Sequence, residues 1–310
     1  MMKNNKVYLP EGNLINTQYN RDSVATLDAL VLAKDNGTIL EGIAVRCDAE
    51  HNLYVQLPCG EGVIPHEEGA LGIAEGLVSD GAIISKVGMP VSFMVTGFEY
   101  TEQGVRPVLS RRVAQERCKA NYVSQLKLGD VIPARITSFA SFGAFCDIGC
   151  GVAAMFPIAY IAVSRIKHPS ELLSVGMDVF GVVVSLDNDR VTLSQRELLG
   201  TWEENAAQFR EGEIVMGVVR TVEPYGCFVE LTPNLSGLSE PKDGVQAGQL
   251  AAVYIKSIQP EKQKVKLAIV NVRDNNNPPA QPKYFITDGP LTYWRYSPEG
   301  SDRVIERRFD

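Results

Sequence analysis

Short runs of alternating or β-branched apolar residues, separated by glycine-rich and polar turns, recur along most of the chain. In the middle of the chain they fall at Val131 to Phe139, Met177 to Leu186 and Arg190 to Leu193. Short strands between regular turn signals are typical of a small all-β barrel or sandwich. We therefore expect a five-stranded barrel over residues 128–196.

The same order of runs occurs before and after this central segment, at a spacing that is of domain size rather than solenoid size. Downstream, a third copy starts at Arg210. Upstream, strands are expected at Thr38 to Arg46, Leu53 to Leu57, Gly62 to Pro65, Pro90 to Phe98 and Arg106 to Ser110.

Two segments between the copies have apolar residues at helical spacing. The first contains Ala114, Cys118 and Tyr122, and in the second Leu198 and Trp202 begin a stripe that continues to residue 209. The predicted division is an N-terminal extended arm at 1–24, barrels at 25–112, 128–196 and 210–270, helical linkers at 113–127 and 197–209, a proline- and asparagine-rich linker at 271–283, and an aromatic hairpin at 284–310.

The aromatic tail has two interpretations, because its rings alternate with arginines. The rings could stack on bases, or they could dock on a barrel. An isolated hairpin is marginally stable in water, which favours docking.

A pair of phenylalanines in the central copy is the main candidate for binding chemistry. Phe142 and Phe145 are three residues apart and would point to opposite faces of a straight strand. Gly143 between them can mark a bulge or bend that brings both rings to one face. Rings beside charged side chains on such a barrel form a stacking platform for single-stranded nucleic acid. The charged candidates are Arg135, Asp187 and Arg190.

Residues 129–194 resemble the S-one RNA-binding domain, a barrel of the oligonucleotide/oligosaccharide-binding (OB) class. The resemblance implies that this copy binds single-stranded RNA through the ring pair. Pro157 stands where many family members have a histidine, so that contact is not carried over. The match runs through Gly129-Asp130-Val131, Phe142-Gly143-Ala144-Phe145, Val175-Gly176-Met177-Asp178-Val179 and Arg190-Val191-Thr192-Leu193-Ser194.

The outer copies differ in how well they match this pattern. In the third copy Tyr225 and Phe228 match the two rings, Lys264 stands in the place of Arg190, and Lys256 is a further basic candidate. The first copy has only Tyr54 at the corresponding place. We therefore expect two RNA-binding barrels and a degenerate first barrel that docks on protein.

The net charge of -7 argues at first against a nucleic-acid partner. The acidity is concentrated between residues 37 and 112, which hold five basic and ten acidic side chains. The other two copies are near neutral, which suits a modest and salt-sensitive grip on RNA.

Other classes of function find little support. No apolar run approaches the ~20 residues that span a bilayer, so we expect a cytoplasmic protein without membrane contact. The six cysteines form no Cys-x-x-Cys pair, and His51, His66 and His168 fit no nucleophile-and-base pattern. We expect no enzymatic activity, no cofactor and no metal.

The predicted protein is all-β: three tandem OB-fold barrels of the S-one type, joined by short helices and followed by a hairpin-like tail. The predicted function is binding of single-stranded RNA, with messenger RNA at the small ribosomal subunit as the favoured partner. Two alternatives stay open: a protein-binding scaffold, and an accessory RNA-binding subunit of an RNA-processing complex.

Overall fold

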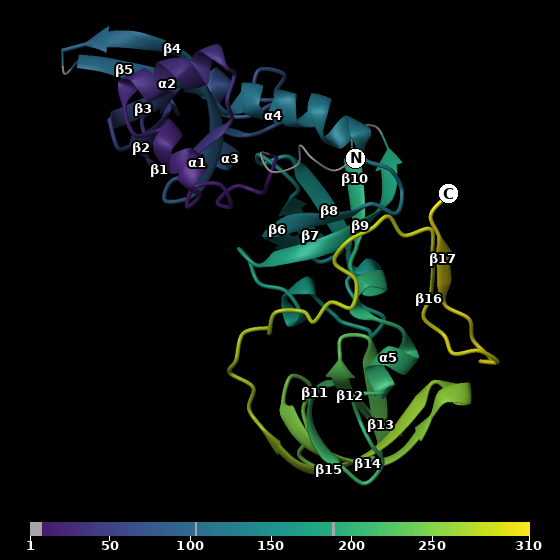
Figure 1. Cartoon of the computed structure of the whole chain (residues 1–310). Coiled ribbons are helices and arrows are strands. Elements are labelled where there is room, and N and C mark those ends of the chain that lie inside the picture. The colour runs from purple at the N-terminus through teal and green to yellow at the C-terminus, as the bar shows by residue number, and fades with distance from the viewer. Residues whose placement is uncertain (1–7, 103, 188–189) are drawn as a thin grey trace. The chain divides into compact units, whose positions relative to one another are not determined.

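The computed structural model describes residues 8–102, 104–187 and 190–310 (Figure 1). The chain divides into two compact units, one of residues 1–126 with 147–153 and one of residues 127–146 with 154–310. Three closed five-stranded barrels and one two-stranded sheet make up the β structure. These sheets confirm the predicted fold class of tandem five-stranded β-barrels. In the ranges that the structure covers, no helix is both long and apolar enough to cross a membrane.

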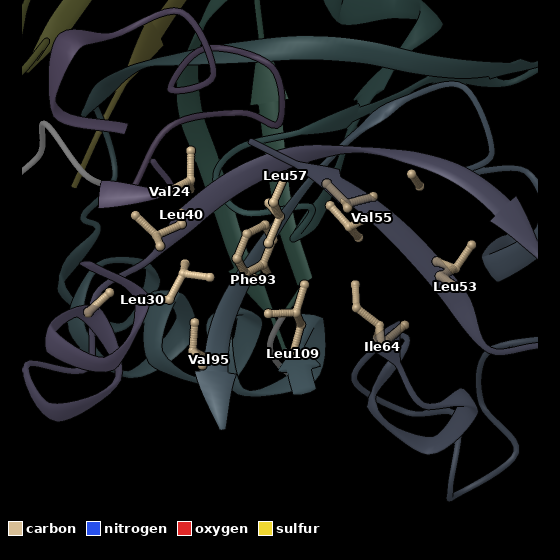
Figure 2. Packing of buried hydrophobic residues seen from close by; sticks show 14 of the residues in the cluster. Val24, Leu30, Leu40, Leu53, Val55, Leu57, Ile64, Phe93, Val95 and Leu109 are labelled. Atoms are coloured by element: carbon tan, nitrogen blue, oxygen red, sulfur yellow. The ribbon is translucent and has the colours of Figure 1, made fainter. Parts of the chain in front are cut away.

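Barrel 1 has the strand order β1-β2-β3-β5-β4, in which a parallel contact of β3 with β5 closes the barrel. Its core is filled by the large apolar side chains that alternate along these strands, with Phe93 and Leu109 fully buried at its centre (Figure 2). The strands agree with those expected from the sequence to within a few residues. They are β1 (Leu40–Cys47), β2 (Leu53–Leu57), β3 (Gly60–Ile64), β4 (Pro90–Thr101) and β5 (Gly104–Ser110).

The segment before barrel 1 is not the extended arm that the sequence predicted. Its described part forms α1 (Gln18–Ser23), capped by Thr17, and α2 (Leu27–Asp35) follows. The Asn20 side chain exchanges two hydrogen bonds with the backbone of Glu41, of 2.8 and 2.9 Å, which fixes α1 on β1. Residues 1–7 of the predicted arm lie outside the described residues.

Short helical elements complete the first unit. A 3-10 turn η1 (His66–Glu68) and α3 (Asp80–Ile84) lie in the long connection from β3 to β4. The predicted first linker helix is α4 (Arg111–Asn121), which begins directly after β5 with Ser110 as its cap. It is followed by η2 (Val123–Gln125).

Barrel 2 has the order β10-β8-β7-β6-β9, with parallel pairing of β8 and β10. Its three predicted runs are strands within one residue of the expected bounds. The strands are β6 (Val131–Ala140), β7 (Gly143–Asp147), β8 (Ala153–Pro157), β9 (Asp178–Asp187) and β10 (Arg190–Ser194). The connection from β8 to β9 contains η3 (Ile158–Tyr160) and η4 (Pro169–Glu171).

Barrel 3 has the same topology, and β13 pairs in parallel with β15 to close it. The second linker forms η5 (Arg196–Leu199) and α5 (Trp202–Ala206), and Trp202 is buried in the core of barrel 3. The last strand runs three residues into the predicted 271–283 linker, because its pairing with β14 continues to Arg273. The strands are β11 (Ile214–Glu223), β12 (Gly226–Thr232), β13 (Leu235–Ser239), β14 (Leu250–Gln259) and β15 (Lys264–Arg273), with η6 (Pro260–Lys262) before the last.

The C-terminal tail forms the antiparallel hairpin β16 (Tyr293–Arg295) and β17 (Glu306–Arg308), which is yellow in Figure 1. Trp294 and Tyr296 are each 5% exposed and belong to the core cluster of barrel 3. Phe309 packs on buried residues of barrel 2 as well as on that cluster. The docking interpretation of the tail is therefore confirmed for these two rings.

Candidate nucleic-acid interface

The predicted ring pair of barrel 2 lies at the turn from β6 to β7. Phe142 occupies this two-residue turn, whereas Phe145 lies inside β7. Their ring centroids are 6.0 Å apart with an interplanar angle of 87°, which is the edge-to-face arrangement that aromatic pairs prefer. Strand alternation does not separate the two rings, because Phe142 precedes the strand.

Gly143 permits this turn through a close approach of two backbones. A Cβ atom at this position would overlap the carbonyl oxygen of Phe156 in the neighbouring β8. Only glycine leaves room for the two strands to pair at that distance. The turn therefore presents Phe142 with 57% of its surface exposed, beside Phe145 with 36% exposed.

Barrel 3 repeats the arrangement at the turn from β11 to β12. Tyr225 lies in the turn and is 65% exposed, and Phe228 lies in β12. Their centroids are 6.3 Å apart at 87°. Gly226 has the role of Gly143, because a Cβ there would overlap the carbonyl oxygen of Ser239. The two barrels thus present matching ring pairs at the same place in the fold.

The second ring pair borders a cleft of about 560 Å³ within the second unit. Lys264 lines this cleft with Tyr225 and Phe228, so the structure brings together three of the predicted residues. Arg165, from the connection after β8, and Arg303, from the tail, also line it. Five basic and three acidic side chains surround the space, but Arg220 is paired with Glu171 and Glu230, which leaves four basic side chains against three acidic ones.

Two of the predicted phosphate contacts are already engaged by carboxylates. The Arg135 guanidinium donates two hydrogen bonds of 2.8 Å to Asp178 on β9. The Lys256 ammonium lies 2.8 Å from Glu240 and holds the pKa of that exposed carboxyl below its usual range. A phosphate must compete with these partners, so both residues are weaker candidates than Lys264.

The remaining predicted pair lies at the end of the β9–β10 hairpin of barrel 2. Asp187 and Arg190 face each other in the strand register and both are exposed. The Ser185 hydroxyl donates to the Asp187 carboxylate. Asn188 and Asp189, which connect the two strands, lie outside the described residues.

The cleft includes a residue that the sequence reasoning missed. Arg303 belongs to the turn of the tail hairpin, where no motif of the barrel family applies. Its neighbour in the cleft, Gln263, donates a hydrogen bond of 2.5 Å to the Arg303 carbonyl oxygen. Only the docking of the tail on barrel 3 brings this arginine to the ring pair, and sequence spacing gives no signal for it.

Barrel 1 lacks a matching ring pair among its described residues. The Tyr54 ring is covered by the Arg46 guanidinium, whose central carbon lies 3.3 Å from the ring centroid. The Tyr54 hydroxyl donates to Asp48 at 3.0 Å. Tyr54, the ring that the sequence analysis placed at the corresponding position of the degenerate copy, thus contacts side chains of its own barrel.

The structure also brings together potential metal ligands that the sequence analysis did not connect. His51, His66 and Asp80 each place a ligand atom within 4.8 Å of the others. The structure therefore offers a candidate metal site in a protein for which the sequence analysis expected no metal. The residues lie on three different elements, and no sequence motif joins them.

Searches among known proteins give partial matches to ribosomal proteins. Small ribosomal subunit protein bS1 of Staphylococcus aureus strain COL is 31% identical over an alignment of 189 residues that covers 55% of this chain and 48% of that protein. The bS1 homolog of Bacillus cereus strain ATCC 10987 is 31% identical over an alignment of 173 residues that covers 51% of this chain and 45% of that protein. The chain therefore spans about half the length of the curated relatives it matches.

No family model matches the chain. Among solved structures, a multidomain protein with nucleic acid binding domains from Streptococcus pneumoniae TIGR4 aligns with 76% of this chain and 74% of its own length, at 13% identity and a TM-score of 0.27. GSP13 from Bacillus subtilis aligns with 28% of this chain and 75% of its own, at 24% identity and a TM-score of 0.22. The chain is thus built of three tandem barrels of OB topology, and over about half of its length it is similar to bS1.

Proposed function

We propose that the chain binds single-stranded RNA through the ring pairs of barrels 2 and 3. The observation that carries the proposal is the repetition of one exposed edge-to-face ring pair at the same turn of two barrels. Large rings are normally buried when they serve only the core. Here Phe142 and Tyr225 are more than half exposed, which leaves their faces free to stack on bases.

The energetics fit a binder that uses both barrels. Stacking of a base on an aromatic side chain contributes ~1–3 kcal/mol. Micromolar affinity needs roughly 8 kcal/mol, which lies within the range of four rings together but above the ~6 kcal/mol that two rings can supply. Both ring pairs lie in the second unit, and we propose that one RNA strand contacts both.

The charged side chains around the rings support a modest electrostatic contribution to RNA binding. Lys264, Arg165 and Arg303 line the cleft beside the second ring pair and are suited to phosphate contacts. Stacking uses the face that every base shares, so recognition is tolerant of sequence. Binding weakens as salt concentration rises, because each phosphate contact releases counterions.

The small ribosomal subunit is the proposed partner because the relatives are named as its proteins, and messenger RNA is the proposed single-stranded ligand there. The acidic barrel 1, whose Tyr54 is covered by Arg46, is proposed to dock on protein rather than on RNA. Cosedimentation with purified small subunits tests this assignment. Copurification with a nuclease instead would favour an accessory role in RNA processing.

Fluorescence anisotropy with a labelled single-stranded RNA at two salt concentrations tests the proposal. We expect the Phe142→Ala/Phe145→Ala variant and the Tyr225→Ala/Phe228→Ala variant each to lose about tenfold or more in affinity, since each loses at least one stacking contact. Tyr100→Ala is the matched control, because this ring of barrel 1 is 91% exposed but belongs to no ring pair. Equal binding by the wild type and both double variants contradicts the proposal.

A further inference from the structure

Two of the three histidines of the chain converge on one carboxylate in barrel 1. His51 comes from the turn between β1 and β2, His66 from η1, and Asp80 from the first turn of α3. His66 Nε2 lies 2.8 Å from Asp80 Oδ1, and His51 Nδ1 lies 3.3 Å from Asp80 Oδ2. All three elements belong to the first unit.

These separations are close to those of a metal site. Zinc bonds of ~2.0–2.2 Å to imidazole and carboxylate place neighbouring tetrahedral ligands about 3.3 Å apart. The ligand atoms all lie within 4.8 Å of one another, so small rotations of exposed side chains complete the geometry. His51, His66 and Asp80 expose 34%, 33% and 51% of their side chains, so a fourth position is open to water.

The backbone around the cluster is held in a form that aims the ligands. His51 has a φ of 63°, in the left-handed region that disfavours most side chains. Histidine, like asparagine and aspartate, is enriched among the non-glycine residues of this region, so the ring is presented by a turn that histidine can adopt. Asn52 fixes the spacing between two ligands, because its side-chain oxygen accepts a hydrogen bond of 2.9 Å from the His66 backbone amide.

The Asn52 anchor is itself rigid. Its backbone amide donates to Asp48 Oδ1 at 2.8 Å, and its side-chain amide donates to Asp48 Oδ2 at 3.0 Å. Such outer contacts orient metal ligands and commonly change affinity by about 10–100-fold.

The ring pairs of barrels 2 and 3 occupy the turns that correspond to the His51 turn. Barrel 1 therefore has a different set of side chains at that place.

We propose that His51, His66 and Asp80 form a binding site for a transition-metal dication, with Zn²⁺ as the best match to two imidazoles and one carboxylate. Water completes the coordination. The ion joins the β1–β2 turn to the long β3–β4 connection and so stabilises the rim of barrel 1. Binding requires both imidazoles to be neutral and releases any proton they carry.

Isothermal titration of the full chain with ZnCl₂, under reducing conditions, tests the proposal. We expect one Zn²⁺ per chain in the wild type, and a loss of about tenfold or more in affinity in His51→Asn and in Asp80→Asn. Asparagine tolerates the left-handed backbone of position 51, so the first variant keeps the turn. His168→Ala is the control, because it removes the one histidine outside the cluster, and it should bind as the wild type does.

Cobalt substitution separates this site from the six cysteines. We expect visible d–d bands of bound Co²⁺ that disappear in both variants, without the near-ultraviolet charge-transfer band of a thiolate ligand. Unchanged Zn²⁺ affinity in His51→Asn and Asp80→Asn would overturn the proposal. A thiolate band would also overturn it, and so would the absence of Zn²⁺ binding by the wild type.

Discussion

Glu41 gives a prediction about how the stability of the first unit depends on pH. The side chain is 1% exposed, and its Oε2 accepts hydrogen bonds of 3.0 and 2.9 Å from the backbone amides of Leu14 and Ile15. Burial nevertheless raises the pKa of Glu41 from 4.5 to about 7, because the charged form loses its hydration. The folded state therefore holds a proton that the unfolded state releases at lower pH.

The direction in which stability changes with pH follows from these two pKa values. Below pH 4.5 both states are protonated, and the stability contribution of Glu41 is fully present. Between pH 4.5 and about 7 only the unfolded state loses its proton, so stability falls as pH rises and levels off above about 7. A difference of this size corresponds to a loss of about 3 kcal/mol.

Glu41→Gln removes this titration and keeps the shape of the side chain. We expect the variant to be more stable than the wild type at pH 8, by up to about 3 kcal/mol, and the difference to shrink toward pH 5. Hydrogen exchange of β1 amides, measured by mass spectrometry, reports on the first unit. Both tryptophans, Trp202 and Trp294, lie in the second unit, so their fluorescence during urea unfolding is an internal control that should not change.

The result that would refute this reasoning is a stability difference between Glu41→Gln and the wild type that does not vary between pH 5 and 8. A variant that is less stable at pH 8 would also refute it. In either case the hydrogen bonds from Leu14 and Ile15 would outweigh burial and keep the carboxylate charged.

Two further substitutions test the packing described above. Arg111→Met should destabilise the first unit by about 3–5 kcal/mol, because the Glu11 carboxylate, which Arg111 contacts at 2.6 and 3.0 Å, would lose its main partner in a buried site. Thermal unfolding followed by circular dichroism measures this loss of stability. An unchanged unfolding temperature of the first unit would contradict the prediction. Gly143→Ala should lower the unfolding temperature of the second unit, because the new methyl group meets the Phe156 carbonyl oxygen and overpacking costs about 1–3 kcal/mol. Tryptophan fluorescence reads this out, and wild-type stability would show that β7 and β8 can separate there.

The three barrels could be predicted from the sequence because their signals are local. Strand alternation and turn residues repeat in each copy, and the Phe-Gly-x-Phe pattern places Phe142 and Phe145 at one turn. The pattern of residues 8–24 gave no such signal, because α1 is only six residues long. Too few residues lie there for a helical period to appear, and Asn20 settles the segment by contacts with distant Glu41.

Charge partners and composite sites were beyond the reach of the sequence for a related reason. Arg135 meets Asp178 only through the register of β6 with β9. His51, His66 and Asp80 lie on separate elements and meet only when the β3–β4 connection folds over the barrel rim. Long-range register and loop docking decide such contacts, and residue spacing carries no information about either.

The docked tail has a consequence for how this protein can be taken apart experimentally. Trp294 and Tyr296 complete the core of barrel 3 from a position beyond residue 283, the end of the predicted linker. A fragment cut at 210–270 would leave the apolar surface beneath these rings open to water and prone to aggregation. The modules that repeat in the sequence are therefore smaller than the pieces that can fold alone, and a dissection of barrel 3 has to carry residues 284–310 with it.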